Sequence, residues 1–331
     1  MTGLLLSPAF VANYGRELDE AAKRAEITPD IIHLPDDAQA RLAPADCARI
    51  EATMCTRDIR FSPLFKTFCD TLIAARNLKW AHFHSTAIDQ HPFVPVLLER
   101  GVTLTTSTGA NGEPVAQTAI AALLMLARGF PHWLSAQQRH AWEPMRGAAL
   151  PTDLRGQTIM VVGLGTIGMP IARFCQALGM RVIGIRRTPR RADDPLDEIH
   201  PPTRFAELLG RCQWLVLSCP HTEETHFMLD AAAIKHLPRG AALINVARGG
   251  VADESAVIDA LNSGQLGRAY LDVFDKEPLP AASPLWDMPN VIITPHSASV
   301  SSGNNRRSVE IFLRNLERFA RGETLLNQLS A

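Results

Sequence analysis

The chain has 331 residues, of which 46% are hydrophobic and 20% are charged. Because this length exceeds the usual size of one domain, two domains are expected. The 33 basic and 34 acidic residues leave a formal net charge of −1. So balanced a charge gives no general attraction for nucleic acid or for an anionic membrane, and we expect a small molecule as the partner.

Neither a targeting segment nor a metal site is indicated. Residues 3–12 are apolar but short, without preceding cationic residues, and no apolar run reaches the length of a membrane span, so a cytoplasmic protein is expected. The six cysteines lack Cys-x-x-Cys spacing and lie mostly in apolar contexts, which predicts buried free thiols. His82, His84 and His91 come without a carboxylate or thiolate motif, so metal binding is not favoured.

The first hundred residues alternate short apolar runs with amphipathic stretches such as residues 62–75. The runs that predict strands are residues 4–6, 31–34, 52–55, 80–83 and 102–105. This alternation favours a parallel sheet covered by helices on both faces. Residues 114–128 then predict a long, mostly apolar helix, whose surface must be buried between domains or between subunits.

A second α/β unit follows a polar, less regular stretch at residues 137–155. Its predicted strands are residues 158–162, 181–185, 214–218, 242–245, 267–272 and 291–294. Six strands with a glycine-rich turn after the first predict a doubly wound nucleotide-binding sheet. Ligands of such sheets bind beyond the carboxyl ends of the strands, so the residues just after these runs are the candidate site.

The turn after the first of these strands carries a dinucleotide-binding pattern. Gly163 permits a tight turn, Gly165 allows the backbone to approach a pyrophosphate, and Gly168 lets the next helix, predicted at residues 166–178, pack closely on the sheet. The amides of Thr166 and Ile167 would then face the anion from the amino end of that helix. A nucleotide cofactor is therefore expected here.

Ordered motifs further along extend this prediction. They are residues 219–225 (Cys-Pro-His-Thr-Glu-Glu-Thr), 245–250 (Asn-Val-Ala-Arg-Gly-Gly), 271–278 (Leu-Asp-Val-Phe-Asp-Lys-Glu-Pro) and 289–296 (Pro-Asn-Val-Ile-Ile-Thr-Pro-His). With the glycine pattern they resemble the D-isomer-specific 2-hydroxyacid dehydrogenase family, in particular its glyoxylate and hydroxypyruvate reductases. The resemblance implies an oxidoreductase acting on CH–OH donors, with hydride transfer between a nicotinamide and the carbonyl carbon of a 2-oxoacid.

Three residues suit the chemistry of that reaction. Arg248 offers a planar fork of donors for the carboxylate and carbonyl oxygens of a 2-oxoacid. His296 is the candidate proton donor, because its ordinary pKa lies near neutrality, and Glu277 would orient it. Each of the three also has a merely structural interpretation, as a residue of a strand-end loop or of the solvated surface.

The resemblance also implies contacts with the cofactor and the substrate. Asp272 corresponds to the residue that hydrogen-bonds the nicotinamide carboxamide, and the motifs add Pro220, Thr225, Val246 and Ala247 to the cofactor site. Ser85, Thr86 and Ala87 lie in the loop after the fourth strand and correspond to residues that bind the substrate carboxylate through backbone amides. Thr86 also corresponds to a residue that touches the cofactor. Ser85 and Ala87 stand where the family usually has glycine, so substrate choice stays open.

The end of the second nucleotide-domain strand predicts which nicotinamide is used. NAD-preferring proteins place an acidic residue there to accept from the ribose hydroxyls. This chain has Arg186 and Arg187 instead, which suit the 2′-phosphate of NADP(H). NADP(H) is the preferred prediction, with NAD(H) as the alternative.

The resemblance implies a fold of two doubly wound parallel-sheet domains. A Rossmann-type nucleotide domain, residues 105–299, is inserted into a flavodoxin-like substrate domain, residues 1–104 and 300–331, which the last helix, Asn304–Ala320, rejoins. The apolar helix at residues 114–128 corresponds to the family's dimer contact, so a homodimer is expected.

Two other functions stay open. A formate or phosphite dehydrogenase is disfavoured because formate enzymes of this fold lack an acid at the Glu277 position. A dinucleotide-sensing corepressor would keep the same three residues, and slow turnover would distinguish it from the enzyme.

Overall fold

The computed structural model describes residues 1–85, 88, 91–147, 150–192, 194–196 and 198–329. It divides into two compact units: unit 1 comprises Met1–Ala110 and Ser301–Ala331, and unit 2 comprises Asn111–Val300. The first crossing was expected at residue 105, which lies inside the last strand of unit 1. The chain instead leaves unit 1 after Ala110.

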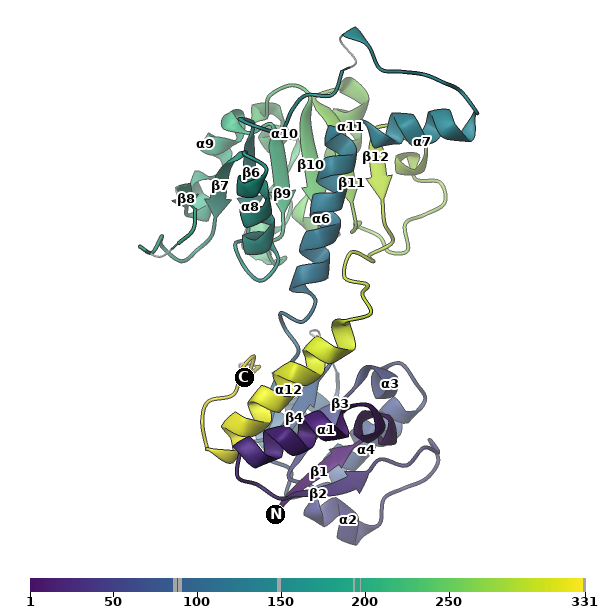
Figure 1. The fold of residues 1–331 in the computed structure, drawn as a ribbon, viewed down its shortest axis with the longest axis vertical. Helices are drawn as coiled ribbons and strands as arrows, with labels where there is room; N and C mark the ends of the chain where they lie inside the picture. The colour runs from purple at the N-terminus through teal and green to yellow at the C-terminus, as the bar shows by residue number, and fades with distance from the viewer. Residues whose placement is uncertain (86–87, 89–90, 148–149, 193, 197, 330–331) are drawn as a thin grey trace. The chain divides into compact units, whose positions relative to one another are not determined.

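Unit 1 is a five-stranded parallel sheet with helices on both faces (Figure 1). Its elements are β1 (Thr2–Leu6), α1 (Pro8–Arg24), β2 (Pro29–His33), α2 (Pro44–Arg49), β3 (Ala52–Cys55), α3 (Arg57–Arg60), α4 (Leu64–Ala74), β4 (Trp80–Phe83), α5 (Phe93–Glu99), β5 (Thr103–Thr106) and α12 (Asn304–Ala320). The strand order β2-β1-β3-β4-β5 is that of flavodoxin. All five strands predicted for this region are confirmed.

Alternation along the strands divides the core of unit 1 into two layers. Leu4 and Leu6 face α1 and α12, where Trp80 stacks on Phe312 with ring centroids 5.0 Å apart. Leu5 faces the opposite layer, which is formed with α4 and α5. The two longest helices of the unit therefore lie side by side on one face of the sheet (Figure 1).

A buried polar network lies inside this core. The imidazole of His82 is fully buried and contacts the Thr105 hydroxyl through Nδ1 at 2.8 Å and the Ser107 hydroxyl through Nε2 at 3.0 Å. The Ser107 hydroxyl continues to Ser308 of α12 at 2.5 Å. Burial, with a smaller contribution from His84, lowers the pKa of His82 to about 3. His82 thus joins β4, β5 and α12 as a neutral imidazole.

Unit 2 contains a seven-stranded parallel sheet. Its elements are α6 (Gly112–Ala127), α7 (Phe130–Gln138), β6 (Thr158–Val162), α8 (Gly168–Ala177), β7 (Arg181–Ile185), β8 (Glu198–His200), α9 (Phe205–Leu208), β9 (Trp214–Leu217), α10 (Ala231–His236), β10 (Ala241–Asn245), α11 (Glu254–Ser263), β11 (Leu266–Leu271) and β12 (Val291–Ile293). The order β12-β11-β10-β9-β6-β7-β8 reverses between β6 and β9, as in dinucleotide-binding sheets. The predicted fold class is confirmed.

One strand of this sheet was not predicted. β8 is a three-residue edge strand, Glu-Ile-His, that pairs with β7. It has no apolar run, because its single isoleucine stands between two polar residues. Only its place beside β7 makes it a strand, which is a tertiary effect that periodicity does not record.

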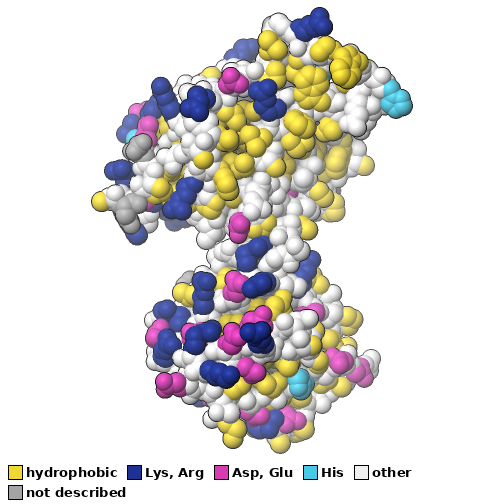
Figure 2. All heavy atoms as spheres, viewed as in Figure 1, with side chains coloured by type: hydrophobic (Ala, Val, Ile, Leu, Met, Phe, Trp, Pro, Cys, Tyr) yellow, Lys and Arg dark blue, Asp and Glu magenta, His cyan; other side chains and the backbone are white. Residues whose placement is uncertain are grey.

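The long apolar helix α6 is buried mainly within unit 2. Val115, Ala119, Leu123 and Leu126 belong to the core layer shared with α8 and the sheet. Leu124 of α6 stays exposed, together with Phe130, Trp133 and Leu134 of α7. Figure 2 shows hydrophobic side chains gathered over this part of unit 2.

No single helix in the described ranges is long and apolar enough to cross a membrane. α6 and α7 reach the required length and composition only when taken together, and the pair is bent by 73°.

Candidate active site

The glycine turn after β6 has the geometry that the sequence predicts. Gly163 has φ +91°, and a Cβ on it would lie 2.7 Å from the Cα of Cys219. A Cβ on Gly168 would lie 1.9 Å from the carbonyl oxygen of Gly163. Both positions therefore exclude any side chain, and the turn brings the start of α8 against the end of β6.

Gly165 differs from Gly163 and Gly168 because a side chain on it would meet open space. A Cβ on this residue would meet no protein atom within 4 Å, and Gly165 and Thr166 are both exposed. The open space lies at the amino end of the ten-residue helix α8, which Ile167 precedes. Free amides and open space at a helix amino terminus suit an anion such as a pyrophosphate, so these residues fit a dinucleotide.

The two arginines after β7 lie in different environments. The Arg186 guanidinium forms a two-point ion pair with Asp194, and its side chain is 14% exposed. Arg187 is exposed, and the structure gives its side chain no hydrogen bond or ion pair with any described residue. The sequence treats the two arginines as equivalent, and the structure separates them.

The segment after β9 is closed by hydroxyl hydrogen bonds. The Thr225 hydroxyl donates to the carbonyl of Pro220 at 2.7 Å and accepts from the amide of Thr222 at 2.8 Å. Pro220 is exposed and Thr225 is half-buried at the carboxyl edge of the sheet. Val246 and Ala247 follow β10 at the same edge and are buried. A ligand can therefore contact their backbone groups but not their side chains.

Arg248 extends from a short loop that is held at both ends. The Asn245 side chain accepts from the amide of Ala247 at 3.1 Å and donates to the carbonyl of Arg248 at 3.3 Å. On the other side, a Cβ on Gly249 would lie 2.0 Å from the carbonyl oxygen of Phe274. The loop of Arg248 therefore contacts the backbone of the segment that leads to Glu277, and Arg248 itself is exposed.

Asp272 holds the loop that carries His296. Its carboxylate is buried, and its Oδ1 accepts from the amides of Ser297 at 2.8 Å and Ala298 at 2.9 Å, and from the Thr294 hydroxyl at 2.5 Å. The backbone carbonyl of Asp272 accepts from the amide of His296 at 2.8 Å. Within the described residues, Oδ2 has no hydrogen-bond partner, which leaves it for a ligand donor such as an amide.

His296 and Glu277 form the predicted pair. The Nδ1 of His296 lies 2.7 Å from Oε2 of Glu277, and Oε1 of Glu277 accepts from the amide of Phe274 at 3.1 Å. The side chains are 46% and 36% exposed, so solvent and ligands reach both. His296 has φ +50°, an unfavourable backbone region for a non-glycine residue that the Asp272 hydrogen bonds maintain.

A pocket with a mixed polar and apolar lining lies at the carboxyl edge of the sheet in unit 1. Its volume is about 150 Å³, and its lining includes Tyr14, Thr56, Arg57, His84 and Asn305. Burial, followed by the charge of Arg57, lowers the pKa of His84. His84 begins the predicted carboxylate-binding loop; Ser85 is described and half-buried, whereas Thr86 and Ala87 lie outside the described residues.

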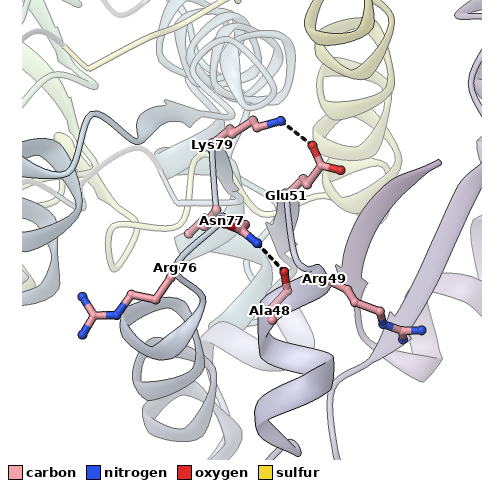
Figure 3. A pocket seen from close by; sticks show the side chains of 7 residues that line it. Ala48, Arg49, Glu51, Arg76, Asn77 and Lys79 are labelled. Carbon is pink, nitrogen blue, oxygen red and sulfur yellow. Dashed lines mark hydrogen bonds and ion pairs between the residues drawn. The ribbon is translucent and has the colours of Figure 1, made fainter.

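A second pocket of unit 1, about 470 Å³ in volume, lies at the opposite, amino edge of the sheet. Figure 3 shows Lys79 pointing toward Glu51, with 2.6 Å between Nζ and Oε2, while Arg49 and Arg76 point away to opposite sides. These cations do not converge on one point. The pocket at the carboxyl edge is therefore the better candidate for a ligand.

Several supporting residues were not predicted. Asn245, Thr294 and Asp194 hold the loops that carry Arg248, His296 and Arg186, respectively. Asn245 could have been found, because it is a polar residue at the end of an apolar strand. In the described part of the chain no group of three His, Cys, Asp or Glu side chains could hold a metal ion.

Comparisons with known proteins identify the family to which the fold belongs. Residues 120–298 match the model for the NAD binding domain of D-isomer specific 2-hydroxyacid dehydrogenases. The glyoxylate reductase of Korarchaeum cryptofilum is 34% identical over 240 residues, which are 70% of each chain.

Solved structures agree over the whole chain. The D-isomer specific 2-hydroxyacid dehydrogenase of Xanthobacter autotrophicus Py2, in complex with NADPH and MES, has a TM-score of 0.73 at 29% identity and covers 100% of this chain and 98% of its own. The NADPH-dependent glyoxylate/hydroxypyruvate reductase of Sinorhizobium meliloti, with NADP and sulfate, has a TM-score of 0.71 at 25% identity and the same coverage. The chain thus belongs to the D-isomer specific 2-hydroxyacid dehydrogenases, NAD(P)-dependent oxidoreductases that act on CH–OH donors.

Proposed function

We propose that this chain reduces a small 2-oxoacid, of the size of glyoxylate or hydroxypyruvate, to the D-2-hydroxyacid with NADPH. The observation that carries the proposal is the 2.7 Å contact between His296 and Glu277. A histidine held by a carboxylate at the carboxyl edge of a nucleotide-binding sheet is an arrangement for moving a proton on and off an oxygen atom. Unit 2 would hold the dinucleotide, and unit 1 would help to hold the substrate.

The bound nicotinamide supplies the hydride that adds to the carbonyl carbon of the substrate. The residues of the chain have the other tasks. Arg248, which is exposed on a loop fixed by Asn245, binds the substrate carboxylate and polarises the carbonyl oxygen. The Nε2 of His296 gives the proton to that oxygen, while Nδ1 stays bonded to Glu277 and fixes the orientation of the ring. In the direction of oxidation the same nitrogen accepts the proton.

Two features support the choice of a small substrate. The pocket of about 150 Å³ in unit 1 adjoins His84, the first residue of the proposed carboxylate-binding loop. Its lining mixes apolar side chains with polar ones such as Tyr14, Thr56 and Asn305, whose polar groups suit the hydroxymethyl group of hydroxypyruvate. In that loop Ser85 stays a proposed substrate contact, with Thr86 and Ala87 as expected from the sequence.

NADPH is proposed over NADH because two cations, Arg186 and Arg187, follow β7 directly. Arg187 is exposed and free to contact a 2′-phosphate. The 2-hydroxyacid dehydrogenase of Xanthobacter autotrophicus holds NADPH in its structure, and the glyoxylate/hydroxypyruvate reductase of Sinorhizobium meliloti holds NADP, which supports the same preference. Gly163, Gly165, Thr166, Ile167 and Gly168 would bind the pyrophosphate.

The remaining predicted contacts are with the nicotinamide half of the dinucleotide. Asp272 would accept from the carboxamide through Oδ2, and the backbone of Pro220, Thr225, Val246 and Ala247 would line the path of the dinucleotide. A homodimer formed through α6 and α7 is also proposed, because Leu124, Phe130, Trp133 and Leu134 are exposed there. Light scattering at micromolar concentration tests it, and a monomeric mass would contradict it.

The test of the proposed function is a crossed reductase assay. NADPH and NADH are each followed against glyoxylate, hydroxypyruvate, pyruvate and phenylpyruvate. We expect the highest kcat/KM with NADPH and one of the first two acids. Comparable efficiency with NADH would overturn the cofactor preference, and a preference for phenylpyruvate would overturn the small pocket. Tight dinucleotide binding with very slow turnover of every acid would favour a dinucleotide-sensing corepressor.

A further inference from the structure

The loop after β7 folds around the side chain of Arg186. Besides the two contacts with Asp194, the guanidinium donates from Nε to the carbonyl of Thr188 at 2.9 Å and from Nη2 to the carbonyl of Pro189 at 2.7 Å. Asp194 also accepts from the amide of Arg191. These contacts gather Thr188, Pro189, Arg191 and Asp194 around Arg186 in a turn at the carboxyl end of β7.

The Arg186 guanidinium and the Asp194 carboxylate already hydrogen-bond to protein groups, so this pair does not suit a ligand site. The side chains of Arg186 and Asp194 are only 14% and 8% exposed, so most of both groups has left solvent. The Arg186 hydrogen bond, helped by the Arg191 amide, lowers the pKa of the Asp194 carboxyl. An arginine whose donors already face a carboxylate and two carbonyls would have to give up these contacts before it could bind a phosphate.

The neighbouring arginines differ in their contacts. Arg187 is exposed and makes no hydrogen bond or ion pair with the residues that the structure describes. Arg190 donates from Nε to the carbonyl of Leu196 at 3.2 Å, and Arg191 is exposed and contributes its amide to the turn. Among the described residues of this loop, the guanidinium groups of Arg187 and Arg191 therefore have no hydrogen bond or ion pair, and Arg187 is the one that is closer to β7 along the chain.

We propose that Arg186 and Asp194 are positioning residues that hold this turn, and that Arg187 is the residue that contacts the 2′-phosphate of the cofactor. The inference rests on the proposed preference for NADPH. The sequence assigns recognition of the 2′-phosphate to two equivalent arginines, whereas the structure divides this task between Arg186, Arg187 and Asp194. Asp194 thereby becomes a determinant of cofactor choice without touching the cofactor. Because the turn is already ordered before the cofactor binds, binding does not lose conformational entropy in ordering it.

The opposite arrangement makes an opposite prediction. If Arg186 left Asp194 to bind the phosphate, the carboxylate would be a competitor of the ligand. Removing its charge by Asp194→Asn would then free Arg186 and strengthen the binding of a 2′-phosphate. Under our proposal the same substitution loosens the turn and weakens that binding. The sign of one change therefore decides between the two.

The experiment measures ligand binding to the full chain by calorimetry, with 2′,5′-ADP and 5′-AMP as probes that differ in the 2′-phosphate. We expect Arg187→Ala to weaken 2′,5′-ADP about ten- to a hundredfold, the usual range for a lost charge-assisted hydrogen bond. We expect Asp194→Asn to weaken it about three- to tenfold, because the loop must then be ordered on binding. Affinity for 5′-AMP should stay unchanged in both variants.

Two further variants serve as controls. Arg181→Ala removes an exposed arginine at the amino end of the same strand and should leave both probes unaffected. Asp194→Glu keeps the charge and should restore part of the lost affinity. In turnover, Arg187→Ala and Asp194→Asn should raise the KM for NADPH with little change in kcat, and leave the KM for NADH unchanged.

The outcomes separate this inference from the proposed function. If the wild-type chain binds the two probes equally, the preference for NADPH is wrong and the inference that rests on it fails with it. If the wild-type chain prefers 2′,5′-ADP but Asp194→Asn binds it more tightly, the preference stands and the positioning role is overturned. Unchanged affinity in Arg187→Ala would likewise overturn the assignment of the phosphate contact.

Discussion

Two histidines in two regions of the molecule show how the same side chain acquires different roles. His82 in the core of unit 1 is fully buried between the hydroxyls of Thr105 and Ser107. His296 at the carboxyl edge of unit 2 is half exposed and bonded to Glu277. Ligands therefore cannot reach the ring of His82, whereas the Nε2 of His296 is open to them.

The difference lies in the partners and in access to solvent. Hydroxyl groups bond to a neutral imidazole without stabilising its charge, and burial disfavours the charged form. The carboxylate of Glu277 fixes the ring of His296 through one nitrogen, which leaves the other nitrogen for a substrate. We therefore expect His82 to govern stability and His296 to govern activity.

The strongest test of this comparison is His296→Asn. Asparagine tolerates the positive φ of this position, so the loop should keep its backbone. We expect kcat to fall about 10²- to 10⁴-fold, as for the loss of a general acid, with unfolding free energy changed by less than about 0.5 kcal/mol because the site is half exposed. His33→Gln, an exposed histidine of unit 1, is the control. Turnover within tenfold of wild type would remove His296 from the proposed mechanism.

A second test replaces Arg248 by lysine. The charge is kept, but the planar fork that can hold two oxygen atoms at once is lost. We expect kcat/KM for the best 2-oxoacid to fall roughly a hundredfold, with dinucleotide affinity unchanged. The matched variant is Arg76→Lys, at the amino edge of unit 1, where no effect is expected. If Arg248→Lys behaved like Arg76→Lys, a loop-capping role for Arg248 would be favoured.

The glycine turn contains its own contrast between an open and a closed position. At Gly165 a Cβ meets no protein atom, whereas at Gly168 it would lie 1.9 Å from a carbonyl oxygen. Overpacking costs about 1–3 kcal/mol, so Gly168→Ala should lose that much unfolding free energy. Gly165→Ala should instead keep its stability and bind NADPH roughly ten- to a hundredfold more weakly. Chemical denaturation and calorimetry measure the two effects, and unchanged cofactor affinity in Gly165→Ala would argue against a pyrophosphate at this turn.

The smallest expected effect is the pH dependence that His82 confers. Its pKa is about 3 in the folded chain and 6.5 for an ordinary histidine. Between these values the unfolded chain binds the extra proton, so stability is fully present above pH 6.5 and is lost as the pH falls toward 3. Urea unfolding of unit 1 should therefore lose about 1.5 kcal/mol from pH 6.5 to pH 5 through this residue. His82→Gln should flatten that slope, with His33→Gln as the control, and an unchanged slope would show that His82 does not titrate in this way.

The fold was largely predictable because its determinants are local. The alternation of apolar runs and amphipathic stretches predicted all five strands of unit 1, and the glycine pattern predicted the turn at Gly163. β8 was not predictable, because its three residues carry no periodic signal and form a strand only beside β7. The first crossing between the units was placed at residue 105, within β5, because a strand end and a domain boundary look alike in sequence.

The candidate site was predictable in its residue types but not in their partnerships. Arg248, Glu277 and His296 follow strands and belong to recognisable motifs. Asp194 could not be assigned, since an acid in a charged loop is ordinarily a solvated residue. Its contact with Arg186 depends on how the loop closes, and that closure changes which arginine is free.

The sequence alone determined the class of fold, the place of the dinucleotide turn and the residue types available for chemistry, because these depend on spacing over a few residues. Only the tertiary structure decided which side chains meet. The close approach of Gly249 to Phe274 brings the loop of Arg248 against the segment leading to Glu277, and Asp272 holds the loop that aims His296 at that carboxylate. Such contacts join residues that are distant along the chain, and packing alone can bring those residues together.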